Sequence, residues 1–191
     1  MNLSKIIIFV LITLALSSFS MAVAQQEPPV LQAGQVPPFQ TGQGLSPMDL
    51  LKNVSNAIAT AKQASKYFTS GNVWIQRAPA GEIVIKAAIV YQNVAVGVLD
   101  FSPIDGTILP CGYHPSVFDT AISLNTIKQK LPSIIANLYV LNGAEFRERE
   151  YCWAIPVAYN NKIVAHVRIS YDGIHVVPDY PATQEMKFYG K

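Results

Sequence analysis

The residues of this chain best suited to chemistry are its two cysteines and three histidines. Cys111 begins the segment C-G-Y-H, which ends at His114, and Cys152 follows about 40 residues later. Thiolate and imidazole groups are ligands that zinc prefers, and the C-x-x-H spacing is sterically reasonable for one ion. Cys111, His114 and Cys152 are therefore a candidate metal or small-ligand site. The other histidines, His166 and His175, occupy strand and turn positions that do not clearly direct them at the cysteines.

The sequence motifs of common enzymes are absent. The chain contains no G-x-S-x-G, no glycine-rich phosphate loop and no H-E-x-x-H. Asp105 and Asp172 each precede a glycine, where an aspartate caps its own backbone and the glycine takes a positive φ. This turn role is favoured over an acid/base pair, so a hydrolase built on the two carboxylates is the weakest hypothesis. We expect a non-enzymatic protein without a cofactor.

The N-terminal segment has the pattern of a signal peptide. Lys5 supplies a positive charge, Ile6–Leu16 is an apolar run that is short for a membrane span, and Ala22-Val23-Ala24 is a small-residue cleavage site. We expect cleavage after Ala24, so that residues 1–24 are removed. The mature protein is then secreted or periplasmic, without stable membrane insertion.

Export changes the interpretation of the two cysteines. In an oxidising compartment an even number of cysteines first indicates a disulfide, here between Cys111 and Cys152. Such a bridge would close a loop of about 40 residues and contribute roughly 4 kcal/mol on the chain-entropy model. Two separate buried thiols remain the alternative to this bridge.

The charge of the chain bears on which partners to expect. The formal net charge is +2, and losing Lys5 with the signal peptide leaves the mature chain near +1. A nearly neutral surface gives no electrostatic reason to bind nucleic acid or an anionic membrane. The low charged fraction, 14%, fits a well-filled core or a surface that contacts another protein.

Residues 25–45 have the composition of a disordered leader. Proline, glutamine and glycine dominate this stretch, which cannot bury enough apolar surface to offset its ordering entropy. After it, Ser46 is a good N-cap and Asp49 a capping-box partner for an amphipathic helix that ends before Gly71.

The sequence after this helix contains an internal repeat. The stretch Glu82–Pro115 recurs more loosely as Glu150–Pro181, with the pair Gln92-Asn93 matching Asn160-Asn161. Self-similarity at a fixed spacing indicates one structural unit used twice. We therefore predict two repeats, residues 46–115 and 116–181, followed by a loose C-terminal tail, residues 182–191.

Each repeat is predicted to be a helix packed on its own antiparallel β-meander, which gives an α+β fold. The predicted strands of the two repeats are Asn72–Ala78, Glu82–Tyr91, Val94–Phe101, Thr107–Leu109, Tyr151–Tyr159, Lys162–Ser170 and Ile174–Val177. In the second repeat a helix should start at Ser116 and kink or divide near Pro132. The segment Glu145–Glu150 alternates in charge, which favours a cross-strand charge ladder at a sheet edge.

The last turn of the first repeat carries a family resemblance. Asp100, Pro103 and Gly106, followed by Ile108-Leu109, resemble the end of the PepSY domain, a small exported module often found in tandem. The second repeat departs from that pattern, because it has Ile169 where the first has Asp100 and keeps only Asp172-Gly173. The resemblance covers residues 46–181. It implies a non-catalytic role in the cell envelope, as a regulatory or protein-binding module, and no catalytic residues.

Four aromatic and arginine residues are candidates for a binding surface. Tyr113, Tyr151, Arg147 and Arg149 are candidate contact residues, since aromatic and arginine side chains are common at protein interfaces. The leading hypothesis is that the chain binds another exported or envelope protein through such residues, its sheet edges or its leader. The sequence does not define the oligomeric state.

Overall fold

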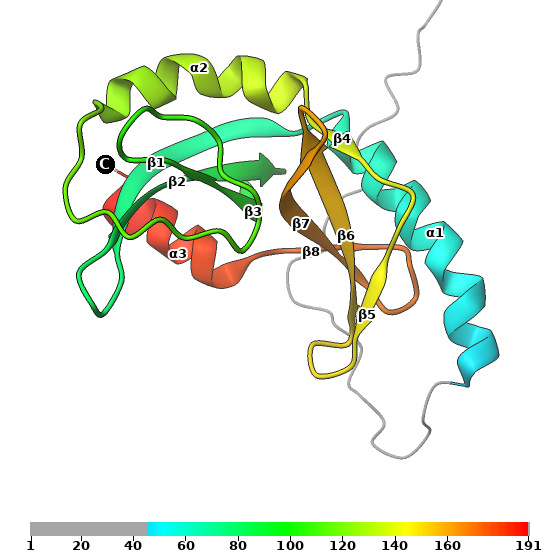
Figure 1. The fold of residues 1–191 in the computed structure, drawn as a ribbon. Coiled ribbons are helices and arrows are strands. Elements are labelled where there is room, and N and C mark those ends of the chain that lie inside the picture. Colours follow the sequence, from blue (N-terminus) through cyan, green and yellow to red (C-terminus); the bar gives the residue numbers. More distant parts are fainter. Residues whose placement is uncertain (1–45, 191) are drawn as a thin grey trace, which may run out of the picture. The chain divides into compact units, whose positions relative to one another are not determined.

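The computed structural model describes residues 46–190, which form an α+β fold with two antiparallel sheets (Figure 1). The predicted signal peptide, residues 1–24, and the leader, residues 25–45, lie outside the described residues. The elements in chain order are α1 (Pro47–Ser65), β1 (Thr69–Arg77), β2 (Ile83–Tyr91), β3 (Val94–Phe101), α2 (Leu124–Ala136), β4 (Tyr139–Val140), β5 (Glu145–Arg147), β6 (Cys152–Tyr159), β7 (Lys162–Ser170), β8 (Val176–Val177) and α3 (Tyr180–Tyr189).

Helix α1 begins at its predicted cap. The Ser46 hydroxyl accepts the Asp49 N–H at 3.2 Å and donates to the Asp49 carboxylate at 2.9 Å. These two bonds confirm the capping interaction and satisfy polar groups at the helix start. Ala57 and Ala61 are completely buried on the inner face of the helix, where their small side chains allow a close approach to a sheet.

The first sheet has the order β1-β2-β3. Strand β3 has its predicted bounds, and the turn before it places Gln92 and Asn93 at φ 48° and 65°. Two consecutive residues with positive φ form the tight hairpin turn that matches the right-handed twist of paired strands. The predicted hairpin between β2 and β3 is thus confirmed.

The second sheet repeats this hairpin. Strands β6 and β7 pair across Asn160 and Asn161, whose φ values are 47° and 63°, and a register shift follows Val157 as another follows Ile89 in the first sheet. Strands β4 and β5 both pair with β6, and β8 pairs with β7. The predicted strand over Glu145–Glu150 is shorter than expected, because β5 ends at Arg147 and a turn follows.

The two sheets are neighbours within one core. Strand β3 lies against β7, where a Cβ on Gly97 would be 3.4 Å from the His166 carbonyl oxygen. One apolar cluster includes Leu99 of the first sheet and Ile155 of the second. No helix in residues 46–190 is long and apolar enough to cross a membrane.

The helices are exchanged between the sheets, which corrects the prediction that each packs on its own meander. Helix α1 contacts β4, β6, β7 and β8 of the second sheet, whereas α2 contacts β1 and β2 of the first (Figure 1). The close packing of two turn glycines against these helices agrees with this exchange. A Cβ on Gly173 would lie 2.7 Å from the Asn53 oxygen of α1, and one on Gly106 would lie 2.8 Å from Ile127 of α2.

Helix α2 begins later than predicted. Its N-cap is Ser123, whose hydroxyl accepts the Asn125 N–H at 3.2 Å, and not Ser116. Pro132 lies inside one continuous helix, so of the two predicted alternatives, a kink or a division near Leu131, the division is wrong. Burial of Leu131 and Ile135 against the first sheet offsets the hydrogen bond that the proline removes.

The predicted loose tail is instead helix α3. The Asp179 carboxylate accepts the Ala182 N–H at 3.1 Å and caps the helix. Ala182 and Met186 are buried against Trp74 and Ala88 on the face of the first sheet opposite α2. The predicted third strand of the first repeat, Thr107–Leu109, is reduced to an isolated bridge between Phe101 and Ile108.

Candidate functional site

Cys111 and His166 form a thiol–imidazole pair. The loop after β3 carries Cys111 across β7, where its N–H donates to the Ile163 carbonyl at 2.8 Å. Its Sγ then lies 3.5 Å from His166 Nδ1, within hydrogen-bonding distance for sulfur. Cys111 is exposed to solvent. Sequence reasoning missed this pairing, because the two residues are 55 positions apart and only the loop position joins them.

The surroundings of the pair favour its neutral form. Desolvation raises the pKa of the Cys111 thiol and Asp100 raises it further, whereas Arg147 lowers it. Burial lowers the pKa of His166, and Arg147 lowers it further. A protonated thiol beside a neutral imidazole is therefore the resting state at neutral pH. Such a pair lacks the depressed thiol pKa of an activated nucleophile.

Cys152 is held apart from this pair, and the predicted disulfide is not formed. Both cysteines are free thiols in the structure. Cys152 is 1% exposed, and its Sγ lies 3.8 Å from Glu150 Oε2. Burial is the main cause that raises its thiol pKa. The structure thus has the alternative of two separate thiols, although only Cys152 is buried.

The three residues of the predicted metal site do not form a cluster in the structure. Within residues 46–190, no group of three or more His, Cys, Asp or Glu side chains is arranged to hold a metal ion. Cys111 has His166 as its close neighbour, while Cys152 contacts Glu150. The residues present do not fit the donor set proposed from Cys111, His114 and Cys152.

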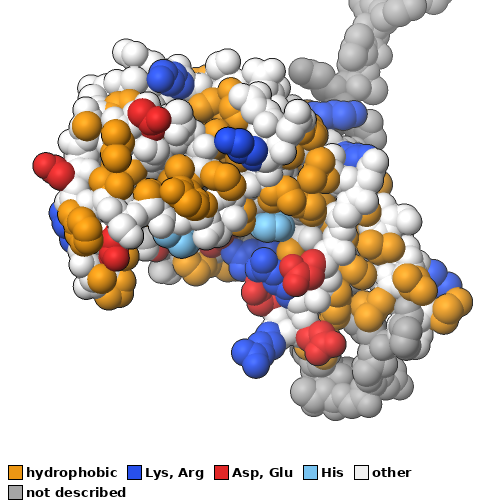
Figure 2. Space-filling model, in the orientation of Figure 1, with side chains coloured by type: hydrophobic (Ala, Val, Ile, Leu, Met, Phe, Trp, Pro, Cys, Tyr) orange, Lys and Arg blue, Asp and Glu red, His pale blue; other side chains and the backbone are white. Residues whose placement is uncertain are grey.

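An ion-pair network occupies the outer face of the second sheet (Figure 2). Arg168 lies 3.3 Å from Glu150 and 2.8 Å from Asp179, and Arg147 lies 3.4 Å from Glu150. The network joins β5, β7 and the cap of α3, so Arg147 has a structural role in addition to any binding role. Arg149, the other predicted contact, is exposed in the turn after β5.

Asp105 and Asp172 serve as turn residues. Asp105 Oδ1 accepts the Thr107 N–H at 3.0 Å, and Asp172 Oδ1 accepts the Ile174 N–H at 3.0 Å. The Thr107 backbone bond is the main cause that lowers the pKa of Asp105. The matching bonds agree with the turn role predicted for both residues.

Asp100, which the sequence singled out only for its family resemblance, is half-buried and has an unusual polar environment. Its Oδ1 atom and the Trp74 Nε1 atom are buried and have no hydrogen-bond partner within residues 46–190. Burial raises the pKa of Asp100, while Lys86 and His114 lower it. In the sheet, Trp74 pairs with Lys86 and Lys86 pairs with Asp100, which places these three residues in one row. Because side chains alternate along a strand, Asp100 lies on the face of the first sheet away from α2.

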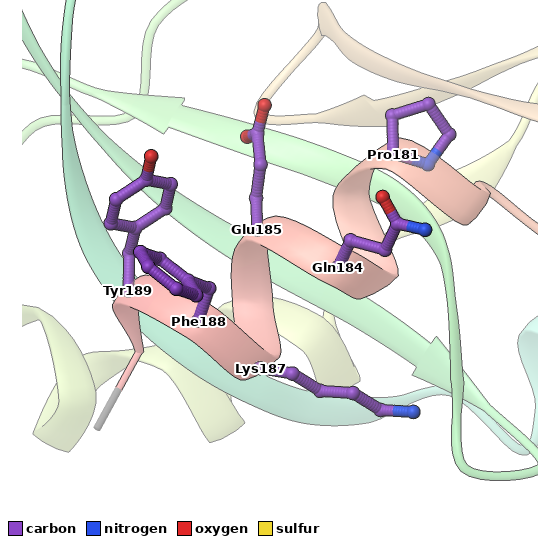
Figure 3. A pocket seen from close by; sticks show the side chains of 6 residues that line it. All are labelled: Pro181, Gln184, Glu185, Lys187, Phe188 and Tyr189. Carbon is purple, nitrogen blue, oxygen red and sulfur yellow. The ribbon is translucent and has the colours of Figure 1, made fainter.

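Aromatic side chains are exposed on α3. Phe188 and Tyr189 are 73% and 60% exposed, and their ring centroids are 4.8 Å apart in an edge-to-face arrangement. They line a pocket together with other residues of the helix, namely Pro181, Gln184, Glu185 and Lys187 (Figure 3). The predicted contact residues Tyr113 and Tyr151 are also exposed, at 55% and 40%. The C-terminal pair was missed because the tail was not expected to fold.

Comparison with known proteins gives no match to a family model, to a curated protein or to a solved structure.

Proposed function

We propose that this chain is an exported, non-enzymatic protein that binds another protein of the envelope or extracellular space. The observation that carries this proposal is the exposed aromatic pair Phe188 and Tyr189 beside a pocket on a packed helix. Large aromatic side chains contribute much of the binding energy at protein interfaces. A helix held by Ala182 and Met186 presents them without a large ordering cost.

We further propose that the chain is built from two PepSY-like repeats. The hairpin turns at Gln92-Asn93 and Asn160-Asn161 have similar φ values, and a register shift lies at the same distance before each turn. The Asp-Gly turns also make matching backbone bonds. These parallels support a duplicated unit whose helices have been exchanged between the two copies.

Side chains with catalytic potential have other roles in this proposal. Asp105 and Asp172 close turns, Arg147 and Arg168 form ion pairs, and the Cys111–His166 pair favours its neutral form. A binding function uses exposed surface and requires none of these groups to react.

Affinity capture from the native envelope tests the binding proposal. The full chain is cross-linked in place and recovered, and bound proteins are identified by mass spectrometry. We expect a specific partner, with recovery reduced about tenfold in a Phe188→Ala, Tyr189→Ala variant because two anchors are lost.

A matched variant controls for loss of exposed aromatic surface in general. Tyr67→Ala, Phe118→Ala removes two side chains that are 45% and 58% exposed elsewhere. Equal loss with both variants would remove α3 as the contact, and recovery of no specific protein by the wild type would refute the binding function. The intact mass of the exported protein, expected to begin at Gln25, checks the export proposal.

A further inference from the structure

We propose that the outer edge of β1, from Ile75 to Arg77, accepts an extended acidic segment of the protein partner as a fourth strand of the first sheet. The inference rests on the proposed binding function and names the surface and the partner's chemistry. Strand addition supplies affinity through main-chain hydrogen bonds and specificity through alternate side chains.

The direction of the backbone groups follows from the pairing of β1 with β2. Ala78 N–H donates to the Glu82 carbonyl at 2.8 Å, so this pair is of the hydrogen-bonded kind. Because antiparallel pairs alternate, the N–H and C=O groups of Val73, Ile75 and Arg77 point away from β2. The Ile83 N–H, which donates to Val117 on the far side of β2, agrees with this alternation.

These outward groups have no partner among residues 46–190. The comparable edge of β3 is covered: Ala95 N–H donates to the Thr183 hydroxyl, Ala95 C=O accepts the Asp179 N–H, and Asp100 C=O accepts the Leu109 N–H. Val73 is only 1% exposed, so its outward groups are covered, whereas Ile75 and Arg77 are exposed and remain available for a new strand.

The edge of β1 also lacks the features that usually discourage pairing. Proteins protect edges with short strands, charges or proline. Strand β5 is three residues long and carries Glu145 and Arg147, and β8 has only two residues. Strand β1 has nine residues with Arg77 as its one charge, and its pairing with β2 is regular from Val73 to Arg77.

Packing on both faces makes this edge a rigid template. Val73 and Trp74 are each 1% exposed, and helices α2 and α3 both contact β1. Ile75 is 39% exposed and offers an apolar contact on the accessible part of the edge, next to Arg77 in the outward row. Figure 3 shows Phe188 and Tyr189 at the end of α3 where it passes β1. A strand added here would lie close to the exposed aromatic pair.

Charge at the edge selects an acidic occupant. Strand β1 and helix α2 carry Arg77 and the exposed Lys128 and Lys130, and neither element contains Asp or Glu. On the other face, α3 contributes one charge of each sign, Glu185 and Lys187. Two copies paired through β1 would bring these positive charges and both α2 helices together, which disfavours a second copy.

The test uses a fluorescein-labelled peptide of alternating Glu and Val, with a Lys and Val peptide as charge control. Anisotropy titrations at low salt compare the full chain with an Ile75→Pro variant. Proline removes the outward N–H and is tolerated at an edge strand, so the fold should persist. We expect Glu/Val binding that weakens about tenfold in the variant, and weaker binding of the Lys/Val peptide.

A second pair of variants keeps the test valid if Ile75→Pro fails to fold. Ile75→Glu retains the backbone groups and repels an acidic strand, whereas Ile104→Glu places the same charge on another exposed isoleucine, 59% exposed. Binding should fall only for Ile75→Glu.

Each outcome has a distinct meaning. Equal binding by wild type and both Ile75 variants overturns the inference and leaves the binding function intact if envelope capture succeeds. Failed capture with edge-dependent peptide binding refutes the proposed function instead. A dimer seen by sedimentation and abolished by Ile75→Pro would assign the edge to a second copy and overturn the acidic-partner proposal.

Discussion

The reactivity of a thiol depends on its exposure and on nearby charge, and the two cysteines of this chain differ in both. Cys111 is exposed beside His166, while Cys152 is buried against Glu150. Each thiol has a raised pKa, with burial as the first cause. Exposure therefore decides which reacts first, and the raised pKa slows both.

Alkylation with iodoacetamide should distinguish the two thiols without prior reduction. We expect Cys111 to react in the folded protein and Cys152 only after unfolding, as followed by peptide mass spectrometry. An Asp100→Asn variant should react faster at Cys111 near neutral pH, because the carboxylate that raises this pKa is gone. Protection of both cysteines until reduction would contradict free thiols.

Asp100 should make stability depend on pH. Its folded pKa lies above the unfolded value, so the folded state holds the proton more tightly and stability falls as pH rises between the two values. Asp100→Asn should therefore be more stable than wild type at neutral pH, with the difference shrinking towards about pH 3. Urea unfolding of both proteins at neutral pH and at about pH 3 measures this difference in stability. A difference that is the same at both pH values would mean that the Asp100 charge is not its cause.

Among the elements, the packing of α1 on the second sheet depends on a turn glycine beneath the helix. Gly173 has φ 80°, and an added Cβ would lie 2.7 Å from the Asn53 oxygen and 2.9 Å from the Ala57 nitrogen. Both atoms belong to the helix backbone and cannot move aside cheaply. The packing of α1 on the second sheet therefore depends on the absence of a side chain here.

Gly173→Ala should destabilise the fold by about 3 kcal/mol, from a left-handed backbone and a steric clash together. Gly112→Ala is the matched control, since Gly112 has φ 81° but nothing lies within 4 Å of its Cβ position. Its cost should be about 1 kcal/mol, from the backbone alone. Denaturant unfolding compares them, and equal costs would argue against close packing of α1 on this turn.

Across the whole molecule, the packing of the helices makes the two sheets interdependent. Helix α1 precedes the first sheet in the chain but packs on the second, and α2 precedes the second sheet but packs on the first. Cutting the chain between Pro115 and Ser116 would thus separate each helix from the sheet that buries it. Each half would expose an apolar sheet face and an apolar helix stripe.

We expect residues 46–115 and 116–190 to be largely unfolded when produced separately, and to recover native circular dichroism when mixed. An apolar face without its covering layer cannot offset the entropy of ordering the chain. Cooperative thermal unfolding by residues 46–115 alone would contradict the exchange. Mixing either half with itself serves as the control.

The local elements could be predicted because their signals are short in range. Ser46 and Asp49 interact within one turn of helix, and the Gln92-Asn93 and Asn160-Asn161 turns set their hairpins directly. Ser116 was mistaken for the second cap because serine caps depend on the residues that follow, and the helix starts only after Ser123. Helix α3 was missed because its burial against Trp74 is a tertiary contact.

The candidate site was only partly predictable. Cys111 was identified, but its partner His166 was not, because loop placement over β7 brings them together. The pairing of Cys111 with Cys152 or a metal rested on residue type, which carries no information on distance. Asp100 is an ordinary residue type, and only the burial of its Oδ1 atom in the folded chain gives it an unusual environment.

The sequence by itself determined the α+β class, the two hairpins, the first helix and its cap, and the turn roles of Asp105 and Asp172. These depend on contacts between residues close in the chain, which a few side chains decide. The arrangement of the elements in space, by contrast, determined which helix covers which sheet and which histidine faces Cys111. The apolar stripe of either helix could cover the apolar face of either sheet. Which helix packs on which sheet therefore depends on shape, as at the close approach of Gly173 to Asn53, and on the path of the connecting loops.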